Sequence, residues 1–438
     1  MFESPAFYPK TLLLVIFTGR RGLSSGKYRQ YHCYCYFSSL LSSLVLSHHA
    51  KSKALCPIEG LPYNAPLFES ALGSLFMQSI QIDQYDALLA EKQQRIESQF
   101  NQFNIPPLQV FASEPTHFRL RAEFRIWHEG ERCFHAMFKP GTKNDPMEVT
   151  DFPIASVAIN ELMPKLMEAI NQDPMLKHKL FQIDYLSTLS GEMLVSLLYH
   201  KPLEDEWLAV ANKLKAQLGV NLIGRARKIR LLLDQDHVIE TLDVDGRQLK
   251  YKQVECSFTQ PNGKMNEKML SWARDCVKGS DWDLLELYCG NGNFSIALAD
   301  QFRRVVATEI SKTSVNAAND SKAMNNITNV DFARVSAEEF TAHMSGEHKR
   351  RRLEGMNLEE ANFGTVLVDP PRAGLDEDSC KMISQYPNIV YISCNPDTLE
   401  ENLKVLSQTH KVERFALFDQ FPYTHHIECG LYLTKKSV

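Results

Sequence analysis

The pattern that most constrains this chain is an alternation of strand-like and helix-like segments between residues 283 and 396. Short apolar runs with the length of buried strands are followed by longer segments with helical spacing. Each apolar run ends in a loop of small or polar residues, and these loops contain Tyr288, Glu309, Asp369 and Cys394. The alternation predicts a parallel sheet with helices on its faces. Ligands of such sheets bind at the carboxyl ends of the strands, so the four loops mark the expected site.

The first loop contains Gly290-x-Gly292, and Glu286 precedes it by four residues. Two glycines after a strand can simply turn the chain, and the third glycine of the dinucleotide fingerprint is replaced by Ser295. The spacing E-x-x-x-G-x-G nevertheless resembles the first motif of S-adenosylmethionine methyltransferases, whose glycines let the backbone approach the cofactor. Glu309 ends the next strand, where an acid can accept hydrogen bonds from both ribose hydroxyls, although it can also be a helix N-cap neighbour. Together these features predict an S-adenosylmethionine site.

The third loop reads Asp369-Pro370-Pro371-Arg372. Its simplest interpretation is a strand that stops at a rigid turn, because proline cannot continue a hydrogen-bonded ladder. Amino-group methylases of DNA and RNA bases carry a similar acid-Pro-Pro sequence that an aromatic residue follows. Arginine at position 372 therefore argues against an exocyclic amine as the methylated group and favours another target atom.

Cys394 and Glu428 form a candidate catalytic pair. A cysteine after an apolar strand is usually buried packing, but a thiolate facing a cofactor pocket is a candidate nucleophile. Methylation of carbon 5 of uracil needs both groups. A thiolate added at carbon 6 makes carbon 5 nucleophilic, and a base later removes the carbon 5 proton. The target base must be turned out of its stack to reach such a pocket.

The middle of the chain contains a strand-like run, residues 118–127, in which charged residues alternate with apolar ones. Arginine beside aromatic residues suits RNA, because guanidinium binds phosphate and stacks on bases, but a solvated strand face with Arg–Glu pairs gives the same pattern. The charged positions are Arg119, Arg121, Glu123 and Arg125. Further strands are expected at 181–185 and 193–199, with helices at 155–171 and 206–217. Two basic clusters, at 225–230 and 348–352, are more typical of solvated loops.

Residues 1–76 differ from the rest because they contain one acidic residue, Glu3, before position 51. A transit peptide has this composition, but a disordered or non-native extension is favoured, since Met77 precedes the first convincing helix, near residues 85–100 with Asp83 as its N-cap. We expect an RNA-binding α/β domain at 77–250 and a methyltransferase domain at 251–438. The formal net charge of −5 leaves RNA contacts to a local patch rather than to the bulk charge.

Several motifs together resemble the bacterial tRNA (uracil-5-)-methyltransferases, within the RNA uracil-5 methyltransferase family. The similarity runs from about Tyr85 to Lys435 and is carried by SFTQPN (257–262), LLELYCGNGNFS (284–295), DPPR (369–372), YISCNP (391–396), FDQFPYTHHIECG (418–430), RAEFRIWH (121–128), KLFQIDYLSTLS (179–190) and SLLYH (196–200). The resemblance implies a Rossmann-like S-adenosylmethionine methyltransferase domain preceded by a mixed α/β RNA-binding domain. It also implies methylation of carbon 5 of the T-loop uridine, position 54, of tRNA and of the similar loop of tmRNA.

The resemblance assigns roles to individual residues. Cys394 is expected to be the nucleophile and Glu428 the proton acceptor. The residues expected to contact S-adenosylmethionine are Gln260, Tyr288, Asn293, Glu309 and Asp369. The residues expected to hold the T arm are Arg125, Phe181 and His200.

The same resemblance frames the partners and the alternatives. The related ribosomal-RNA enzymes carry an N-terminal cysteine cluster for an iron–sulfur centre, whereas Cys133 is the only cysteine between residues 77 and 255. We therefore expect neither an iron–sulfur cluster nor a metal. Ribosomal-RNA uracil-5 methylation stays the alternative activity, and a non-catalytic RNA-folding module is a third possibility. A monomeric cytoplasmic enzyme with no membrane partner is expected.

Overall fold

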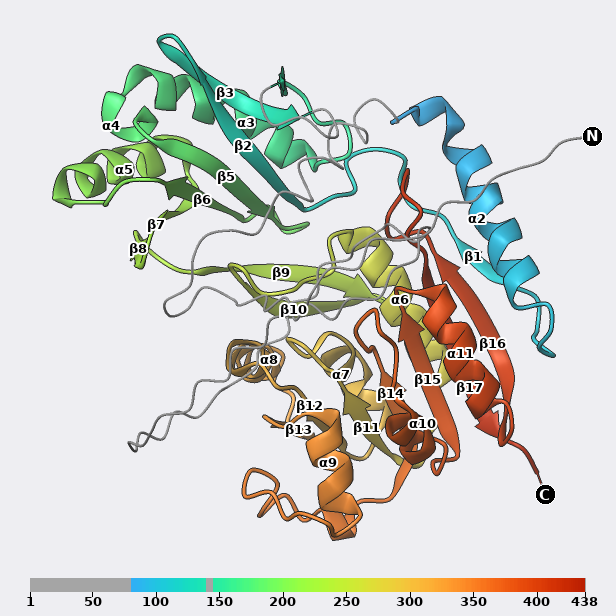
Figure 1. Ribbon diagram of the computed structural model, residues 1–438. Helices are drawn as coiled ribbons and strands as arrows, with labels where there is room; N and C mark the ends of the chain where they lie inside the picture. The colour runs from blue at the N-terminus through green and yellow to red at the C-terminus, as the bar shows by residue number, and fades with distance from the viewer. Residues whose placement is uncertain (1–79, 139–144, 438) are drawn as a thin grey trace, which may run out of the picture.

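The computed structural model describes residues 80–138 and 145–437. These residues form two large sheets, one from the middle and one mainly from the last third of the chain, with a two-stranded hairpin between them (Figure 1). The proposed extension at residues 1–76 lies outside the described residues. Within the described ranges, no helix combines the length and apolar character needed to cross a bilayer.

The sheet of the last third has eight strands in the order β1-β16-β17-β15-β14-β11-β12-β13. β17 is antiparallel to both of its neighbours, and all other pairs are parallel. The strands are β1 (Gln109–Phe111), β11 (Asp283–Leu287), β12 (Val305–Thr308), β13 (Val330–Ala333), β14 (Phe363–Val368), β15 (Asn388–Ser393), β16 (His410–Phe418) and β17 (Glu428–Lys435). Because β12 and β14 lie on opposite sides of β11, the chain reverses direction across the sheet at β11, and ligand crevices form at such a point.

Helices cover both faces of this sheet, which explains why its strands are apolar throughout. Leu284 and Leu367 pack with α6 and α7 on one face, whereas Leu285 and Val366 pack with α2, α9, α10 and α11 on the other. The helices are α2 (Tyr85–Gln99), α6 (Gly263–Cys276), α7 (Asn293–Leu298), α8 (Lys312–Met324), α9 (Ala337–Met344), α10 (Glu377–Ile383) and α11 (Pro396–Leu406), with short 3-10 turns η1 (Ile82–Gln84), η2 (Ala299–Gln301) and η3 (Leu358–Glu360). The predicted Rossmann-like arrangement is confirmed.

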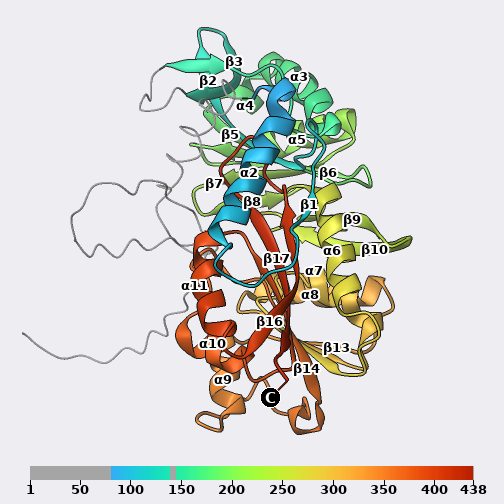
Figure 2. The same cartoon turned by 90° about the vertical axis from the view of Figure 1, so that its right-hand side faces the viewer.

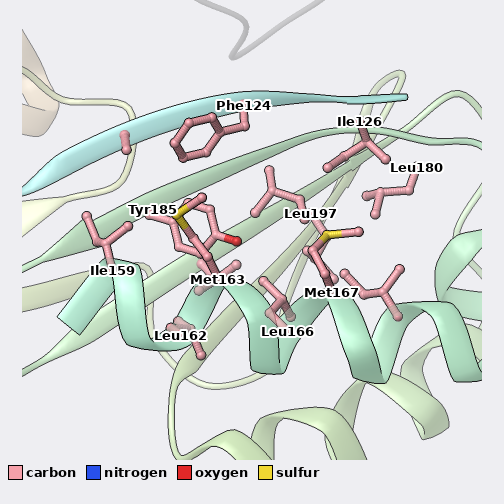
Figure 3. Packing of buried hydrophobic residues seen from close by; sticks show 14 of the residues in the cluster. Phe124, Ile126, Ile159, Leu162, Met163, Leu166, Met167, Leu180, Tyr185 and Leu197 are labelled. Atoms are coloured by element: carbon pink, nitrogen blue, oxygen red, sulfur yellow. The ribbon is translucent and has the colours of Figure 1, made fainter. Parts of the chain in front are cut away.

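The middle sheet has seven strands in the order β4-β3-β2-β5-β6-β7-β8, and one pair, β6 with β7, is parallel. The strands are β2 (Arg121–Glu129), β3 (Arg132–Phe138), β4 (Pro146–Glu148), β5 (Leu180–Ser187), β6 (Met193–Tyr199), β7 (Asn221–Ala226) and β8 (Ile229–Leu232). Helices α3 (Val157–Gln172), α4 (Pro174–Lys177) and α5 (Asp205–Leu218) pack on one face. Figure 3 shows Met163 and Leu166 of α3 packed below Phe124, Tyr185 and Leu197 of the sheet. The opposite face carries the polar side chains of β2 and β5, as the alternation predicted.

Two elements connect the sheets. The hairpin β9 (His237–Val244) and β10 (Arg247–Val254) places Leu242 and Tyr251 in the same core as α6. Helix α2 contributes Tyr85 to the core of the middle sheet and Ile96 to that of the parallel sheet (Figure 2). The first α-helix of the described residues therefore packs against both halves of the molecule.

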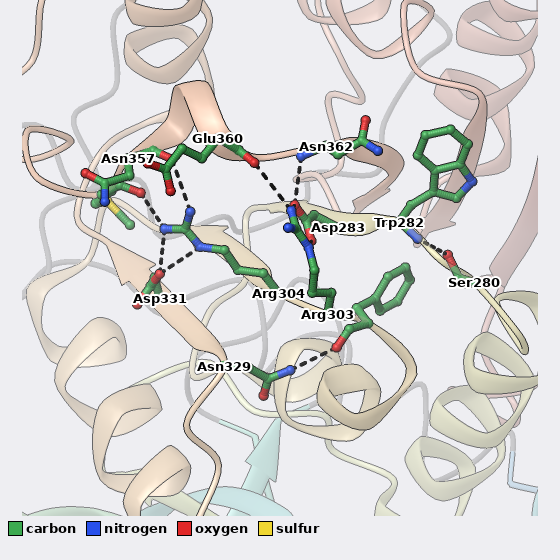
Figure 4. A network of polar contacts seen from close by, with 12 residues as sticks. Ser280, Trp282, Asp283, Arg303, Arg304, Asn329, Asp331, Asn357, Glu360 and Asn362 are labelled. Atoms are coloured by element: carbon green, nitrogen blue, oxygen red, sulfur yellow. Dashed lines mark hydrogen bonds and ion pairs between the residues drawn. The ribbon is translucent and has the colours of Figure 1, made fainter.

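At the amino ends of the parallel strands, two arginines fasten the strands to the loop before β14 (Figure 4). Arg303 Nε donates to Asp283 at 2.9 Å, and Arg304 Nη2 donates to Asp331 at 2.8 Å. Arg304 Nη1 also donates to the main-chain oxygen of Asn357 at 3.2 Å. These contacts tie the amino ends of the strands together, whereas ligands of parallel sheets bind at the opposite, carboxyl ends.

Three local predictions are wrong. Helix α2 begins after η1, and the Asp83 side chain does not cap it. Arg119 precedes β2, and its Nε donates to the Arg121 carbonyl oxygen at 2.8 Å instead of joining the charged strand face. Arg225 lies within β7 rather than in a solvated loop, and it is buried in an ion pair.

Candidate active site

The loop between β11 and α7 turns where the two glycines stand. Gly290 and Gly292 have φ angles of 56° and 83°, and Tyr288 also has a positive φ of 63°. A Cβ atom at position 292 would lie 3.0 Å from the ring of Phe332, so both conformation and space favour glycine there. The loop has the backbone geometry that the proposed cofactor motif requires.

Glu309 joins this loop to the next one. Its carboxylate accepts hydrogen bonds from the main-chain nitrogens of Gly290 at 3.1 Å and Ser311 at 2.6 Å. Burial raises the pKa of Glu309, and these two backbone donors oppose the rise. A carboxylate offers about four lone-pair sites, so acceptor capacity remains for ribose hydroxyls. The structure thus gives Glu309 a local structural role beside the cofactor role that we predict.

Asn293 begins helix α7 and forms a reciprocal amide pair with Asn266 of α6. Each side chain donates to the other at 2.9 Å. Tyr251 Oη also donates to the Asn293 carbonyl oxygen at 3.1 Å. The Asn293 side chain is therefore held by α6, and Asn266 is a partner that sequence reasoning missed, because nothing local in the sequence connects positions 266 and 293.

Cys394 and Glu428 become neighbours through the register of two strands. β15 and β17 are antiparallel, with Ser393 opposite Cys429, so the residues just beyond this pair, Cys394 and Glu428, lie at the same end of the ladder. Asp369 follows β14, which is parallel to β15. The structure therefore brings Asp369, Cys394 and Glu428 together at the carboxyl end of the sheet, as the sequence spacing predicted for the first two.

Burial dominates the electrostatics of this cluster. It raises the pKa of Cys394 to about 12, with further increases from Glu428 and Asp369 that Arg372 opposes. Burial also raises the pKa of Asp369 to about 7 and that of Glu286 to about 8. The pKa of Glu428 is raised well above its usual range by burial and then by Asp369. A cluster of buried acids favours a bound cation, because the cation stabilises their charged forms.

Arg372 links the loops that carry the nucleophile and the acid. Its main-chain oxygen accepts hydrogen bonds from Asn395 Nδ2 at 2.9 Å and Thr398 Oγ1 at 3.2 Å. Its guanidinium donates to the ring of His426, two residues before Glu428. Burial and the charge of Arg372 lower the pKa of His426 to about 4, so the ring is a neutral acceptor. Sequence reasoning used Arg372 to exclude one target atom and missed this link.

Gln260 lies between β10 and α6, close to the exposed ring of Phe258. Its Oε1 accepts a hydrogen bond from Gln420 Nε2 at 2.6 Å. Gln420 follows β16 and is completely buried. This contact joins the 257–262 motif to the 418–430 motif, and sequence reasoning missed Gln420 because the two residues are 160 positions apart.

The three residues predicted to hold RNA contact one another on the middle sheet. The rings of Phe181 and His200 stack with centroids 3.8 Å apart and an interplanar angle of 13°. The Arg125 guanidinium lies 5.6 Å from the centroid of Phe181. Stacked rings beside a guanidinium form the kind of platform on which unpaired RNA bases stack.

A buried ion-pair network lies nearby, on strands β7 and β8. Glu255 accepts from Arg225 Nε and Nη2, both at 2.6 Å, from Arg230 Nε at 3.1 Å, and from Ser196 Oγ at 2.5 Å. Burial alone would raise the pKa of Glu255, but Arg225 holds it below its usual range. Arg225 of the basic cluster at 225–230 is thus part of the folded core, whereas Arg230 reaches Glu255 from an exposed position.

Comparison with known proteins gives consistent results. A family model described as tRNA (Uracil-5-)-methyltransferase matches residues 84–436. The chain is 56% identical over 360 residues to the tRNA/tmRNA (uracil-C(5))-methyltransferase of Vibrio parahaemolyticus, which covers 81% of this chain and 97% of the relative. It is also 56% identical over 359 residues to the protein of the same name from Photobacterium profundum, over 80% of this chain and 97% of that relative.

The fold is similar to a solved structure, the crystal structure of Pyrococcus abyssi tRNA (uracil-54, C5)-methyltransferase in complex with S-adenosyl-L-homocysteine. The TM-score is 0.63 at 19% sequence identity, and the match covers 80% of this chain and 83% of that chain. At this identity the likeness concerns the fold alone, and it confirms the predicted arrangement of a methyltransferase sheet and a mixed α/β domain.

Proposed function

The chain belongs to the tRNA (uracil-5-)-methyltransferase family, and we propose that it methylates carbon 5 of the T-loop uridine, position 54, of tRNA and of the similar loop of tmRNA. The reaction proceeds through a covalent bond between Cys394 and the base. The observation that carries this proposal is the meeting of Cys394, Glu428 and Asp369 at the carboxyl end of the sheet, in the register set by β15 and β17.

Cys394 and Glu428 divide the work on the base. The Cys394 Sγ thiolate adds to carbon 6 of uracil, and the electron pair of the 5,6 double bond moves toward carbon 5. After carbon 5 has gained its methyl group, the Glu428 carboxylate accepts the carbon 5 proton, the double bond re-forms and the thiolate leaves. The register that places Glu428 beside Cys394 at the end of the ladder supports this division of roles.

The acidic cluster suits the positive charge of S-adenosylmethionine. Burial raises the pKa values of Glu286, Glu309, Asp369 and Glu428, and the charge of Asp369 raises those of Glu286 and Glu428 further. S-adenosylmethionine, when bound, supplies the methyl group and a positive charge. We propose that Gln260, Tyr288, Asn293, Glu309 and Asp369 hold it. A cation among these carboxylates favours their ionised forms, and Arg372 favours the thiolate of Cys394 in the same way.

The middle sheet is proposed to hold the T arm. Phe181 and His200 form a stacking platform, and Arg125 supplies charge beside it. Since the formal charge of the chain is −5, affinity for RNA depends on such local groups. We place the reaction in the cytoplasm, by a monomer without iron–sulfur cluster or metal, and we keep domain limits of 77–250 and 251–438.

The test is to incubate the purified protein with S-adenosylmethionine and RNA that lacks 5-methyluridine, and to map the product by mass spectrometry. Separate arms contain tRNA, tmRNA and ribosomal RNA. We expect 5-methyluridine at the T-loop uridine of tRNA and in the similar loop of tmRNA. Modification of the ribosomal RNA alone would establish the alternative activity, and no modification in any arm would leave a non-catalytic RNA-folding role.

A further inference from the structure

The side-chain amide of Gln420 is completely buried, and its nitrogen and oxygen differ in their hydrogen bonding. Its Nε2 donates to Gln260 Oε1 at 2.6 Å, whereas its own Oε1 has no hydrogen-bond partner among the described protein groups. An unsatisfied buried carbonyl destabilises a fold. A leucine would fill similar space without that penalty, so the hydrogen bond to Gln260 is the feature that distinguishes glutamine at this position.

Gln420 is also held on a rigid segment. The preceding residue, Asp419, accepts from Lys92 Nζ of α2 at 2.6 Å, and its main-chain nitrogen donates to the Phe111 carbonyl oxygen at 3.0 Å. The Gln420 main-chain nitrogen donates to the Phe418 carbonyl oxygen at 2.8 Å. The Gln420 amide therefore approaches Gln260 from a fixed direction.

The contact determines which end of the Gln260 amide remains for a ligand. Gln260 Oε1 is occupied by Gln420, while Gln260 is partly exposed and its Nε2 donates to no other described residue. The titratable groups of the neighbouring loops are the carboxyl groups of Glu286, Glu309, Asp369 and Glu428, the Cys394 thiol and the Arg372 guanidinium. The Gln260 NH₂ group is an uncharged donor that keeps its donor character at any pH.

We propose that Gln420 is a positioning residue that turns the Gln260 amide so that its NH₂ group faces the ligand and binds a carbonyl or carboxylate oxygen. The proposal rests on the proposed function, which supplies two ligands with such an oxygen: a carbonyl of the target uracil and the carboxylate of S-adenosylmethionine. If the uracil carbonyl at carbon 4 is the partner, the same donor disfavours cytosine, whose amino group stands there.

The test compares Gln420→Leu, Gln260→Leu and the double variant. One arm measures the Kd for S-adenosylhomocysteine by calorimetry. The other measures the rate of covalent adduct formation with a T-arm RNA that carries 5-fluorouridine at the target position, in the presence of S-adenosylmethionine. We expect Gln420→Leu either to raise the Kd for S-adenosylhomocysteine or to lower the rate of adduct formation, by roughly 3- to 10-fold, the range for one lost hydrogen bond. The arm that changes identifies the oxygen.

The double variant separates positioning from a general structural effect. If Gln420 acts through Gln260, adding Gln420→Leu to Gln260→Leu changes neither arm further. Gln420→Glu should weaken binding more than Gln420→Leu, because a carboxylate at 420 accepts from Gln260 Nε2 and turns its carbonyl toward the ligand. The matched control is Gln109→Leu in β1, which removes an acceptor for Trp272 Nε1 of α6. It should leave both the Kd and the rate of adduct formation unchanged. Thermal melts verify that each variant is folded.

Two results would overturn the proposal: a folded Gln420→Leu variant with wild-type values in both arms, or effects of the two single variants that add in the double variant. A wild-type protein that binds S-adenosylhomocysteine but forms no adduct would instead overturn the proposed function. In that case the affinity arm alone still decides the role of Gln420.

Discussion

Glu255 and Glu286 are both buried glutamates, but their surroundings shift their pKa values in opposite directions. Beside the middle sheet, Arg225 and Arg230 surround Glu255, and Arg225 holds its pKa below the usual range despite burial. In the parallel sheet, Glu286 has a hydrogen bond from Ser295 but pairs with no cationic side chain among the described residues, and burial raises its pKa to about 8. An acid that pairs with arginine stabilises the packing of two elements, whereas a buried acid without a cationic partner favours binding of a positively charged ligand.

The comparison has exceptions on both sides. In the parallel sheet, Asp283 is buried but pairs with Arg303, which holds its pKa below the usual range. Asp184 of the middle sheet accepts from Gln182 Nε2 at 2.7 Å, and its pKa is raised by burial and then by Glu123. It lies on the same strand as Phe181, at the proposed RNA platform. Unpaired acids therefore occur in both sheets at the places where ligands are proposed, and paired acids occur where the packing is structural.

Removing the nucleophile should have the largest effect. Cys394→Ala should lower turnover by roughly 10⁴-fold or more, the scale for loss of a covalent nucleophile. It should also abolish the RNA adduct seen on denaturing gels. Cys429→Ala, which changes the neighbouring buried cysteine, is the control. Wild-type turnover in Cys394→Ala would exclude the covalent mechanism.

Glu428→Gln should separate adduct formation from release. Without a base to accept the carbon 5 proton, turnover should fall by roughly 10²- to 10⁴-fold, while the adduct forms and persists. Quenched-flow sampling of adduct against free product measures both steps. Normal release of product would show that another group is the base, although Cys394 would keep its role.

Breaking the paired acid should affect stability rather than chemistry. Glu255→Gln leaves Arg225 without its full counter-charge, so the free energy of unfolding should fall by roughly 3–5 kcal/mol, as for other broken buried pairs. Urea titration measures this, and kcat of the folded variant should stay near wild type. Asp331→Asn, which weakens the more exposed pair with Arg304, should change stability by at most about 1 kcal/mol. Equal losses of unfolding free energy in both variants would show that the buried pair at Glu255 contributes no more to stability than the more exposed pair at Asp331.

Glu286→Gln should do the reverse at alkaline pH. The folded pKa of Glu286, about 8, lies above its ordinary value of 4.5. The stability that the protonated form contributes is therefore complete below pH 4.5 and is lost as the pH rises through 8. Glutamine keeps the neutral form, so the variant should be more stable than wild type at pH 8, by up to roughly 1.4 kcal/mol per unit of the shift. Melting curves between pH 4.5 and 8.5 measure the difference, and a constant difference would contradict the raised pKa.

The smallest effect is expected at the RNA platform. Arg125→Gln should weaken T-arm binding a few-fold and lower the slope of log affinity against log salt by about one, because one phosphate contact is lost. Fluorescence anisotropy at several salt concentrations measures both. Arg132→Gln, at an exposed pair on β3, is the control. Weaker binding with an unchanged slope would show that Arg125 stacks on a base instead.

The sequence allowed the parallel sheet and its site-bearing loops to be predicted, because period and loop chemistry are local signals. Strand β15 ends at Ser393, directly before Cys394, as expected for a loop that carries a site residue. The links between loops could not be predicted. Gln420 meets Gln260, and Arg372 meets His426, only after strand order is established. The burial of Arg225 was missed for the same reason, since its partner Glu255 comes from the end of β10.

Helix α2 has a consequence for how this protein becomes active during synthesis. Lys92 near the start of the described chain pairs with Asp419 near its end, and Lys92 Nζ also donates to the Phe421 carbonyl oxygen at 2.9 Å. Both contacts lie in the segment that leads to Glu428. A contact between residues so far apart in sequence can form only after residues 419–421 have left the ribosome. The segment that leads to Glu428, the proposed base, is therefore fastened to α2 late in synthesis.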